Sequence, residues 1–311
     1  MTDVNEILRL VQEHLSQAEI DSPQAEAATI VAHVLGISRG RLGVLQALGA
    51  RLEAGDVAKI TELATARATR TPLQYLIGTT GFYGLDLKVA PGVFIPRVET
   101  EVLVETTVQH FATHPGPLKI LDLCTGSGAI AAAVADQMRQ RNIPVEVWAV
   151  DISPEATELA RTNTAQHKVT VLCADATDHR NVIAAAPKLS SLRGTFDAVV
   201  SNPPYIPTTT PVTQHEAEYD PHRALYGGSA DGTAIPLRIA HQAAEWLAPG
   251  GLFMMEHDHT HATQLVAALV ASSVWDQVQT VKDLTGADRF VAAIRTSSAK
   301  PSPNSSSTLA Q

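Results

Sequence analysis

Apolar and charged positions alternate along the first eighty residues with the period of an α-helix. Apolar residues recur three or four positions apart, with charged and polar residues between them, at Val4, Ile7, Leu8, Leu10, Val11 and Leu15. This spacing predicts an amphipathic helix, and we expect three more helices, at residues 22–36, 39–48 and 56–70. The second begins at Ser22-Pro23, an N-cap residue followed by proline at the first helical position. The pattern predicts a small helical bundle over residues 1–80.

The pattern changes after Thr71, where glycines and prolines separate short runs of β-forming residues. Two such runs are Leu85–Val89 and Val93–Ile95, and together they predict a β-hairpin linker over residues 81–96. A helix is expected to start near Glu99, because acidic residues there suit the first turn of a helix.

From residue 118 onward, apolar runs alternate with helical patterns. Strands are expected at 118–123, 145–151, 169–173, 196–201, 252–256, 278–282 and 289–294. Helices are expected at 129–138, 153–164, 231–247 and 262–271. The βαβαβ order at its start predicts an α/β fold with a parallel, doubly wound sheet and a ligand crevice at the carboxyl ends of the strands.

A glycine-rich turn follows the first of these strands. It reads Asp122-Leu123-Cys124-Thr125-Gly126-Ser127-Gly128, and Gly126-x-Gly128-x-x-Ala131 fits a dinucleotide-binding fingerprint. Asp151, at the end of the next strand, is placed to accept hydrogen bonds from both hydroxyls of a ribose. Asp122 could hold the turn or face an ammonium group, and Asp175 could accept from an adenine amine, although each acid could equally be a cap of a helix or turn. These features suit NAD and S-adenosylmethionine equally.

The strand at 196–201 ends in an unusual tetrapeptide, Asn202-Pro203-Pro204-Tyr205. Two prolines cannot donate ladder hydrogen bonds, so the strand stops and a stiff loop begins. The Asn202 side-chain oxygen and the Pro203 carbonyl can each accept a hydrogen bond from one –NH2 group, and Tyr205 can lie against a flat substrate. Acceptors that favour a pyramidal nitrogen would act mainly in the transition state. The loop therefore indicates chemistry on an amide or aryl amine nitrogen.

This loop separates the two cofactor interpretations. A dehydrogenase needs a hydride-transfer site and a proton-relay residue, and the chain offers no convincing one. An amide-holding loop beside an adenosine pocket indicates methyl transfer to nitrogen instead.

Composition and charge limit which partners and which cellular location we expect. The net charge of −9 argues against nucleic acid as the main partner, because tracking a phosphate backbone requires stripes of Lys and Arg. Two cysteines without CxxC spacing indicate a reducing, cytoplasmic location. No apolar run reaches the roughly 18 residues needed to span a bilayer, and the N-terminus lacks the features of a signal peptide. His257, His259 and His261 alternate, but we expect no metal, since methyl transfer from a sulfonium needs none.

The combination of this tetrapeptide with the Asp122-to-Gly128 turn resembles the class I S-adenosylmethionine-dependent amino-methyltransferases. Three other stretches resemble the glutamine methyltransferases that modify peptide chain release factors. They are Arg70-x-Pro72-Leu73-Gln74-Tyr75-Leu76-x-Gly78, Phe94-Ile95-Pro96-Arg97-Val98-Glu99-Thr100-Glu101 and Asp283-Leu284-Thr285-Gly286-Ala287-Asp288-Arg289-Phe290. The likeness extends from the helical module to about residue 295.

The resemblance implies a seven-stranded, Rossmann-like class I methyltransferase sheet at 97–296, preceded by a helical docking domain at 1–80. It implies methylation of the glutamine amide in the Gly-Gly-Gln motif of class I release factors. The methyl donor would be held by Asp122, Cys124, Thr125, Gly126, Ser127, Gly128, Asp151, Asp175 and Asn202. The glutamine would be held by Asn202, Pro203, Pro204 and Tyr205, of which Asn202, Pro203 and Tyr205 would be catalytic.

Two positions depart from the family pattern. Cys124 stands where glycine is commoner, a change that leaves backbone contacts possible. Ala176 stands where an aromatic residue often follows the acid of the third strand, so adenine stacking at that point is in doubt. From Ser297 onward the serine- and proline-rich sequence predicts a disordered tail, and we expect a monomer.

Two other functions remain open. The tetrapeptide is shared with adenine amino-methyltransferases, and a flipped base in DNA or RNA could occupy the same loop. A catalytically inactive donor-binding module would keep the fold without turnover.

Overall fold

The structure is a computed structural model that describes residues 1–211 and 219–297, so most of the predicted tail lies outside the described residues. The chain divides into two compact units, which are described separately. The helical unit consists of Met1–Gly81, Asp86–Ile95 and Pro211–Pro221. The sheet unit consists of Phe82–Leu85, Pro96–Thr210 and the chain from His222 onward.

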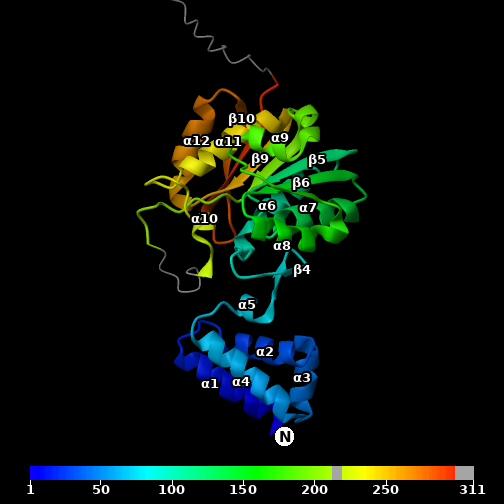
Figure 1. Cartoon of the computed structure of the whole chain (residues 1–311), viewed down its shortest axis with the longest axis vertical. Helices are drawn as coiled ribbons and strands as arrows, with labels where there is room; N and C mark the ends of the chain where they lie inside the picture. Colours follow the sequence, from blue (N-terminus) through cyan, green and yellow to red (C-terminus); the bar gives the residue numbers. More distant parts are fainter. Residues whose placement is uncertain (212–218, 298–311) are drawn as a thin grey trace, which may run out of the picture. The chain divides into compact units, whose positions relative to one another are not determined.

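The first four helices of the chain form the bundle of the helical unit (Figure 1), as predicted: α1 Val4–Gln17, α2 Pro23–Val34, α3 Arg39–Ala47 and α4 Ala54–Ala68. Of the periodic residues of α1, four are buried, Leu8 is half-buried and Leu10 is exposed; the buried ones are Val4, Ile7, Val11 and Leu15. Two short strands, β1 Thr2–Asp3 and β2 Arg51–Leu52, pair antiparallel. Ser22 is the N-cap residue of α2, but its side chain makes no capping hydrogen bond.

A partly buried ion pair joins α4 to α2 in this unit. Arg67 Nε lies 2.6 Å from Glu26 Oε2 and Arg67 Nη2 lies 3.2 Å from Glu26 Oε1. A bidentate pair of this kind fixes both position and direction of the two helices.

The hairpin of the linker lies earlier than predicted. Its strands are β3 Thr79–Phe82 and β4 Leu85–Lys88, after the short helix α5 Leu73–Ile77. Val93–Ile95, predicted as the second strand, is not a strand. Tyr83 and Gly84 both have positive φ, which is the geometry of a two-residue hairpin turn.

The sheet unit contains a seven-stranded sheet with the order β10-β11-β9-β8-β5-β6-β7. Its strands are β5 Leu118–Leu123, β6 Val145–Asp151, β7 Thr170–Cys173, β8 Phe196–Ser201, β9 Leu247–Glu256, β10 Trp275–Lys282 and β11 Asp288–Arg295. The five strands from β7 to β9 run parallel, and β11 is antiparallel to both of its neighbours. This order confirms the predicted doubly wound class I methyltransferase sheet.

Helices cover both faces of this sheet (Figure 1). One layer contains α6 Glu101–His110, α7 Ala129–Gln140 and α8 Pro154–Thr164, and the short 3₁₀ helix η1 Val98–Thr100 precedes α6. The other contains α9 His179–Ala185, α11 Ala234–Trp246 and α12 Ala262–Ala271. Among the described residues, the structure also has the short helix α10 His222–Leu225 and the 3₁₀ turns η2 Ala165–His167, η3 Pro187–Leu192 and η5 His259–His261.

The core of the sheet unit explains why its strands are apolar runs. Trp246, Phe196 and Phe253 are fully buried between the sheet and the helices. Strands covered on both faces cannot alternate apolar and polar residues.

Among the described residues, no single helix has the length and apolarity to cross a membrane. One bent pair of helices, α2 with α3, meets the length and composition criteria for a span, and on those criteria alone.

Candidate active site

Strand register brings the predicted site residues to one edge of the sheet. Leu123 of β5 pairs with Ser201 of β8, and Ser201 pairs with Met255 of β9. The next residue along each strand is therefore level with the others, which places Cys124, Asn202 and Glu256 side by side. The direction of chain progression reverses between β5 and β8, and such a switch point is where ligands bind in open α/β sheets.

The glycine turn has the conformation that its residues require. Cys124, Gly126 and Gly128 all have positive φ, at 62°, 56° and 82°. A Cβ on Gly128 would lie 3.0 Å from Thr164 Cγ2 and 3.1 Å from the Ala160 Cα, so only glycine lets α8 pack this closely. A Cβ on Gly126 would meet nothing within 4 Å, which leaves open space against this backbone for a ligand.

Asp151 braces this turn from the neighbouring strand. Its Oδ2 accepts the Gly126 N–H at 2.8 Å and its Oδ1 accepts the Ser153 N–H at 2.9 Å. Each carboxylate oxygen keeps a second lone pair. Burial raises the pKa of Asp151, while these backbone N–H groups and the charge of Arg223 oppose the shift.

The segment 218–228 follows the proline loop in the chain, and from its sequence we expect it to border the substrate cleft; Glu218 lies outside the described residues, and Arg223 lies on α10. The charge of Arg223 lowers the pKa of Asp151. Tyr205 and Ile206 both donate their N–H groups to the Leu225 carbonyl, at 3.1 and 2.8 Å. A Cβ on Gly232 would lie 2.2 Å from the Tyr205 carbonyl oxygen. The backbone of this segment and the backbone of Gly232 therefore both pack directly against the backbone of the proline loop.

Asp122 and Asp175 have different surroundings. Asp122 is fully buried, and its Oδ2 accepts the Thr125 hydroxyl at 2.5 Å, so it holds the turn. Burial raises the pKa of Asp122 to about 7, although the Thr125 hydroxyl favours the charged form. Asp175 Oδ1 accepts from the Thr177 N–H and hydroxyl, which makes Asp175 a turn cap in this structure. Ala176 is buried in the hydrophobic core.

The proline loop follows β8 directly. Pro203 is buried and Asn202, Pro204 and Tyr205 are half-buried. Beneath the loop, the Ser201 hydroxyl donates to the Leu123 carbonyl at 2.7 Å, which ties the ends of β8 and β5 together. Asn202 and the glycine turn therefore sit on one rigid base.

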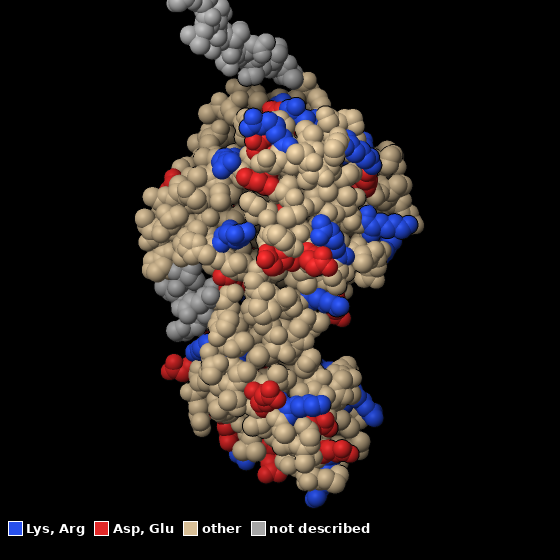
Figure 2. Space-filling view, viewed as in Figure 1, with Lys and Arg blue, Asp and Glu red and all other residues tan. Residues whose placement is uncertain are grey.

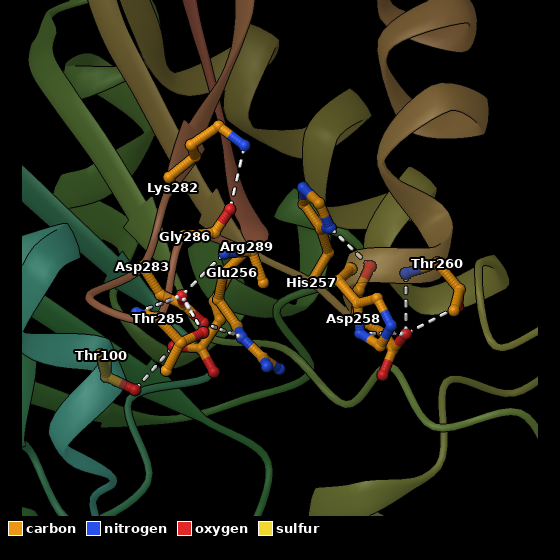
Figure 3. Close-up of polar contacts among 12 residues, drawn as sticks. Thr100, Glu256, His257, Asp258, Thr260, Lys282, Asp283, Thr285, Gly286 and Arg289 are labelled. Carbon is orange, nitrogen blue, oxygen red and sulfur yellow. Dashed lines mark hydrogen bonds and ion pairs between the residues drawn. The ribbon is translucent and has the colours of Figure 1, made fainter.

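Two residues that sequence reasoning did not single out, Thr100 and Glu256, contact this loop. Figure 3 shows the contact between the two. The Tyr205 hydroxyl donates to Glu256 Oε1 at 3.0 Å, and the Thr100 hydroxyl donates to Glu256 Oε2 at 2.6 Å. Asn202 Nδ2 lies 3.2 Å from the Thr100 oxygen. A glutamate at the end of an otherwise apolar strand was the available signal for Glu256.

Three other residues were also missed. Asn163 Nδ2 donates to the Ser127 carbonyl at 2.9 Å and so holds the glycine turn from α8. Ile152, directly after Asp151, is 53% exposed, an unusual state for a large apolar side chain at a ligand crevice. Gly232 supports the proline loop as described above.

The alternating histidines do not converge. His257 and His261 are buried, His259 is exposed, and His257 Nδ1 is bonded to the Asp258 carbonyl. Within residues 1–211 and 219–297 there is no group of three His, Cys, Asp or Glu side chains that could hold a metal ion.

On the face of the sheet unit in Figure 2, basic and acidic side chains are intermixed, without a continuous basic stripe.

Comparisons with known proteins agree with this geometry. The family described as PrmC N-terminal domain matches residues 6–78, and the methyltransferase small domain matches residues 85–215. The chain is similar to a release factor glutamine methyltransferase of Mycobacterium tuberculosis, 39% identical over 282 residues that cover 90% of this chain and 88% of that protein. The corresponding protein of Mycolicibacterium smegmatis is 41% identical over 295 residues, covering 95% and 99%.

A solved structure described as a methyltransferase from Pyrococcus furiosus is more distantly similar, at 19% identity and a TM-score of 0.47 over 68% of this chain and 90% of that one. The assignment rests on the sequence relatives, which match both units over nearly their whole length. The chain belongs to the release factor glutamine methyltransferase family.

Proposed function

We propose that this protein transfers a methyl group from S-adenosylmethionine to the side-chain amide of the glutamine in the Gly-Gly-Gln motif of class I peptide chain release factors. The observation that carries the proposal is the position of Asn202. It lies at the switch point of the sheet, beside the glycine turn and on the same edge as Asp151. The names of the relatives support the release factor as the protein substrate.

The residues at the glycine turn fit S-adenosylmethionine. Gly126 leaves space for a ligand against its backbone, and Asp151 retains lone pairs for two ribose hydroxyls. Ile152 offers an exposed apolar side chain to an adenine ring. We assign the donor to Asp122, Cys124, Thr125, Gly126, Ser127, Gly128 and Asp151, with Asn202 at its reactive end. Asp175 remains a candidate for the adenine amine through its second oxygen.

When bound, S-adenosylmethionine supplies an electrophilic methyl group on a sulfonium sulfur: the C–S bond breaks as the C–N bond forms, sulfur is left as a neutral thioether, and the cationic amide nitrogen releases one proton to solvent. The protein holds the acceptor nitrogen in line with that methyl group. Asn202 Oδ1 and the Pro203 carbonyl accept the two amide protons, which favours a pyramidal nitrogen over the delocalised planar form. Tyr205 lies along the flat face of the amide, and Pro204 stiffens the loop. Positioning of this kind supplies much of the acceleration in a bimolecular transfer.

We assign the helical unit to docking of the release factor, because it contains none of the residues placed at the donor or acceptor site. We expect the protein to act as a monomer in the cytoplasm, where translation terminates.

The test is methyl transfer from labelled S-adenosylmethionine to a purified release factor. A release factor whose Gly-Gly-Gln glutamine is replaced by alanine is the matched control, and a DNA duplex and an RNA hairpin are the other acceptors. We expect label only in the unaltered release factor. Equal labelling of the two release factors contradicts the proposal, and salt-sensitive labelling of the nucleic acids favours an adenine amino-methyltransferase.

A further inference from the structure

Two side chains from separate parts of the sheet unit, Thr100 and Tyr205, meet at the buried carboxyl group of Glu256. Thr100 comes from η1, Tyr205 from the proline loop and Glu256 from the end of β9. Thr100 is 3% exposed and Glu256 is 2% exposed. The hydrogen bonds run from Asn202 Nδ2 to the Thr100 oxygen, from the Thr100 hydroxyl to Glu256 Oε2, and from the Tyr205 hydroxyl to Glu256 Oε1.

The pKa of Glu256 lies above its ordinary value, because burial outweighs the groups around it that favour the charged form. Burial raises the pKa of Glu256, whereas the Thr100 and Tyr205 hydroxyls and the charge of Arg289 lower it. Arg289 is itself held by Asp283, with its Nε 3.1 Å from Asp283 Oδ2 (Figure 3). The contact of 2.6 Å between Thr100 and Glu256 is in the range of a hydroxyl that donates to a carboxylate.

In the structure both the Thr100 and the Tyr205 hydroxyl donate to the Glu256 carboxyl oxygens, and this sets the direction of the bonds in the chain. The single proton of the Thr100 hydroxyl is used on Glu256, and the Thr100 oxygen can then only accept. Asn202 must therefore direct its NH2 group toward Thr100. Its carbonyl oxygen is left as the group available to a substrate.

We propose that Glu256 is a positioning residue that, through Thr100, fixes which end of the Asn202 side chain faces the acceptor, so that the loop selects a group that donates hydrogen bonds, such as a primary amide. This inference rests on the proposed function. A carboxylate acceptor would face both Asn202 Oδ1 and the Pro203 carbonyl without a proton to offer, and is rejected. The bond from Tyr205 to the same carboxylate fixes the ring that lies along the amide.

Three variants of the full-length protein separate this role from a structural one. In Glu256→Gln the new amide can donate to Thr100, which permits the reverse direction of the chain and a flipped Asn202. Thr100→Val keeps the shape but removes the hydroxyl, and Thr100→Ser keeps the hydroxyl. We expect Glu256→Gln and Thr100→Val to lose about 100-fold in kcat for release factor methylation, with little change in the KM for S-adenosylmethionine. Thr100→Ser should retain activity within about threefold. The double variant that combines Glu256→Gln with Thr100→Val should lose no more activity than either single variant.

A second measurement reads the orientation without turnover. In the wild-type protein, the Asn202 side-chain NH2 resonance, assigned by its absence in Asn202→Ala, should exchange slowly with solvent. In Glu256→Gln and Thr100→Val it should exchange much faster, while the thermal unfolding midpoint of Glu256→Gln stays close to that of the wild type.

An unchanged kcat and unchanged amide exchange in Glu256→Gln would overturn the inference, as would equal losses in Thr100→Val and Thr100→Ser. Absence of release factor methylation by the wild-type protein would instead contradict the proposed function. In that case amide exchange still decides the inference, because it needs no acceptor.

Discussion

Asp151 accepts the backbone N–H of Gly126 at 2.8 Å, so that the end of β6 holds the turn that follows β5. The same carboxylate also accepts the Ser153 N–H at the start of α8. The acid therefore shapes the glycine turn, and we propose that its remaining lone pairs accept hydrogen bonds from the ribose of the donor.

Replacing Asp151 should weaken donor binding before it affects chemistry. In Asp151→Ala the loss of hydrogen bonds to a charged group costs about 1.5–3 kcal/mol, or roughly 10- to 100-fold in affinity for S-adenosylmethionine. Titration calorimetry measures this directly. Glu158→Ala, an exposed acid on α8, is the control and should bind normally. Unchanged donor affinity in Asp151→Ala would remove Asp151 from the site.

Replacing Asn202 should have the opposite effect. We propose that Asn202 is an acceptor that acts mainly in the transition state, so in Asn202→Ala kcat should fall by about 10²- to 10³-fold while donor binding is largely kept. Steady-state kinetics with the release factor and calorimetry with the donor separate these effects. Asn181→Ala, an exposed asparagine on α9, should behave as the wild type. Lost donor affinity in Asn202→Ala would mean that its main role is in holding the cofactor.

The positive φ of 62° at Cys124 explains why glycine suits this position in the family. A side chain in the left-handed region costs roughly 1–2 kcal/mol, and a β-branched one costs more. We expect Cys124→Gly to change the free energy of unfolding by less than about 1 kcal/mol, because relief of this strain offsets the added freedom of the unfolded chain. Cys124→Val should destabilise strongly. Chemical denaturation compares them, and similar losses in both would show that thiol packing outweighs the backbone.

The raised pKa of Asp122 predicts how the stability of the protein without bound ligand depends on pH. Burial raises the pKa of Asp122 from its ordinary value of 3.8 to about 7 in the folded protein. Between these values the folded chain keeps a proton that the unfolded chain has lost, so stability falls as pH rises. In Asp122→Asn this fall should be smaller, as thermal unfolding midpoints from pH 4 to 8 would show. Asp86→Asn, an exposed acid on β4, should keep the wild-type slope, and a wild-type slope in Asp122→Asn would contradict the raised pKa.

Much of the fold follows from local sequence. The strands β5, β6 and β8 were predicted with their observed bounds, because strands buried on both faces form largely apolar runs and a glycine or proline follows each of these within three residues. The short helix α9 was missed, since its seven residues are too few for a periodic pattern. The hairpin of the linker was misplaced because its turn, Tyr83-Gly84, lacks the usual Asn-Gly or Asp-Gly signal.

The site likewise contains features that local sequence predicts and features that it does not. The glycine turn, Asp151 and the proline loop are consecutive motifs whose spacing carries their chemistry. The bond between Thr100 and Glu256 joins residues 156 positions apart, and no local pattern indicates it. Likewise, the requirement for glycine at position 232 arises only where its backbone meets the Tyr205 carbonyl.

The most direct test of the central claim is the position of the added methyl group. After incubation of the protein with S-adenosylmethionine and a release factor, tandem mass spectrometry of the peptide containing Gly-Gly-Gln should find one added methyl group, on the side-chain amide of that glutamine. Methylation at another residue, or an unmodified glutamine when the protein is saturated with donor, would contradict the account.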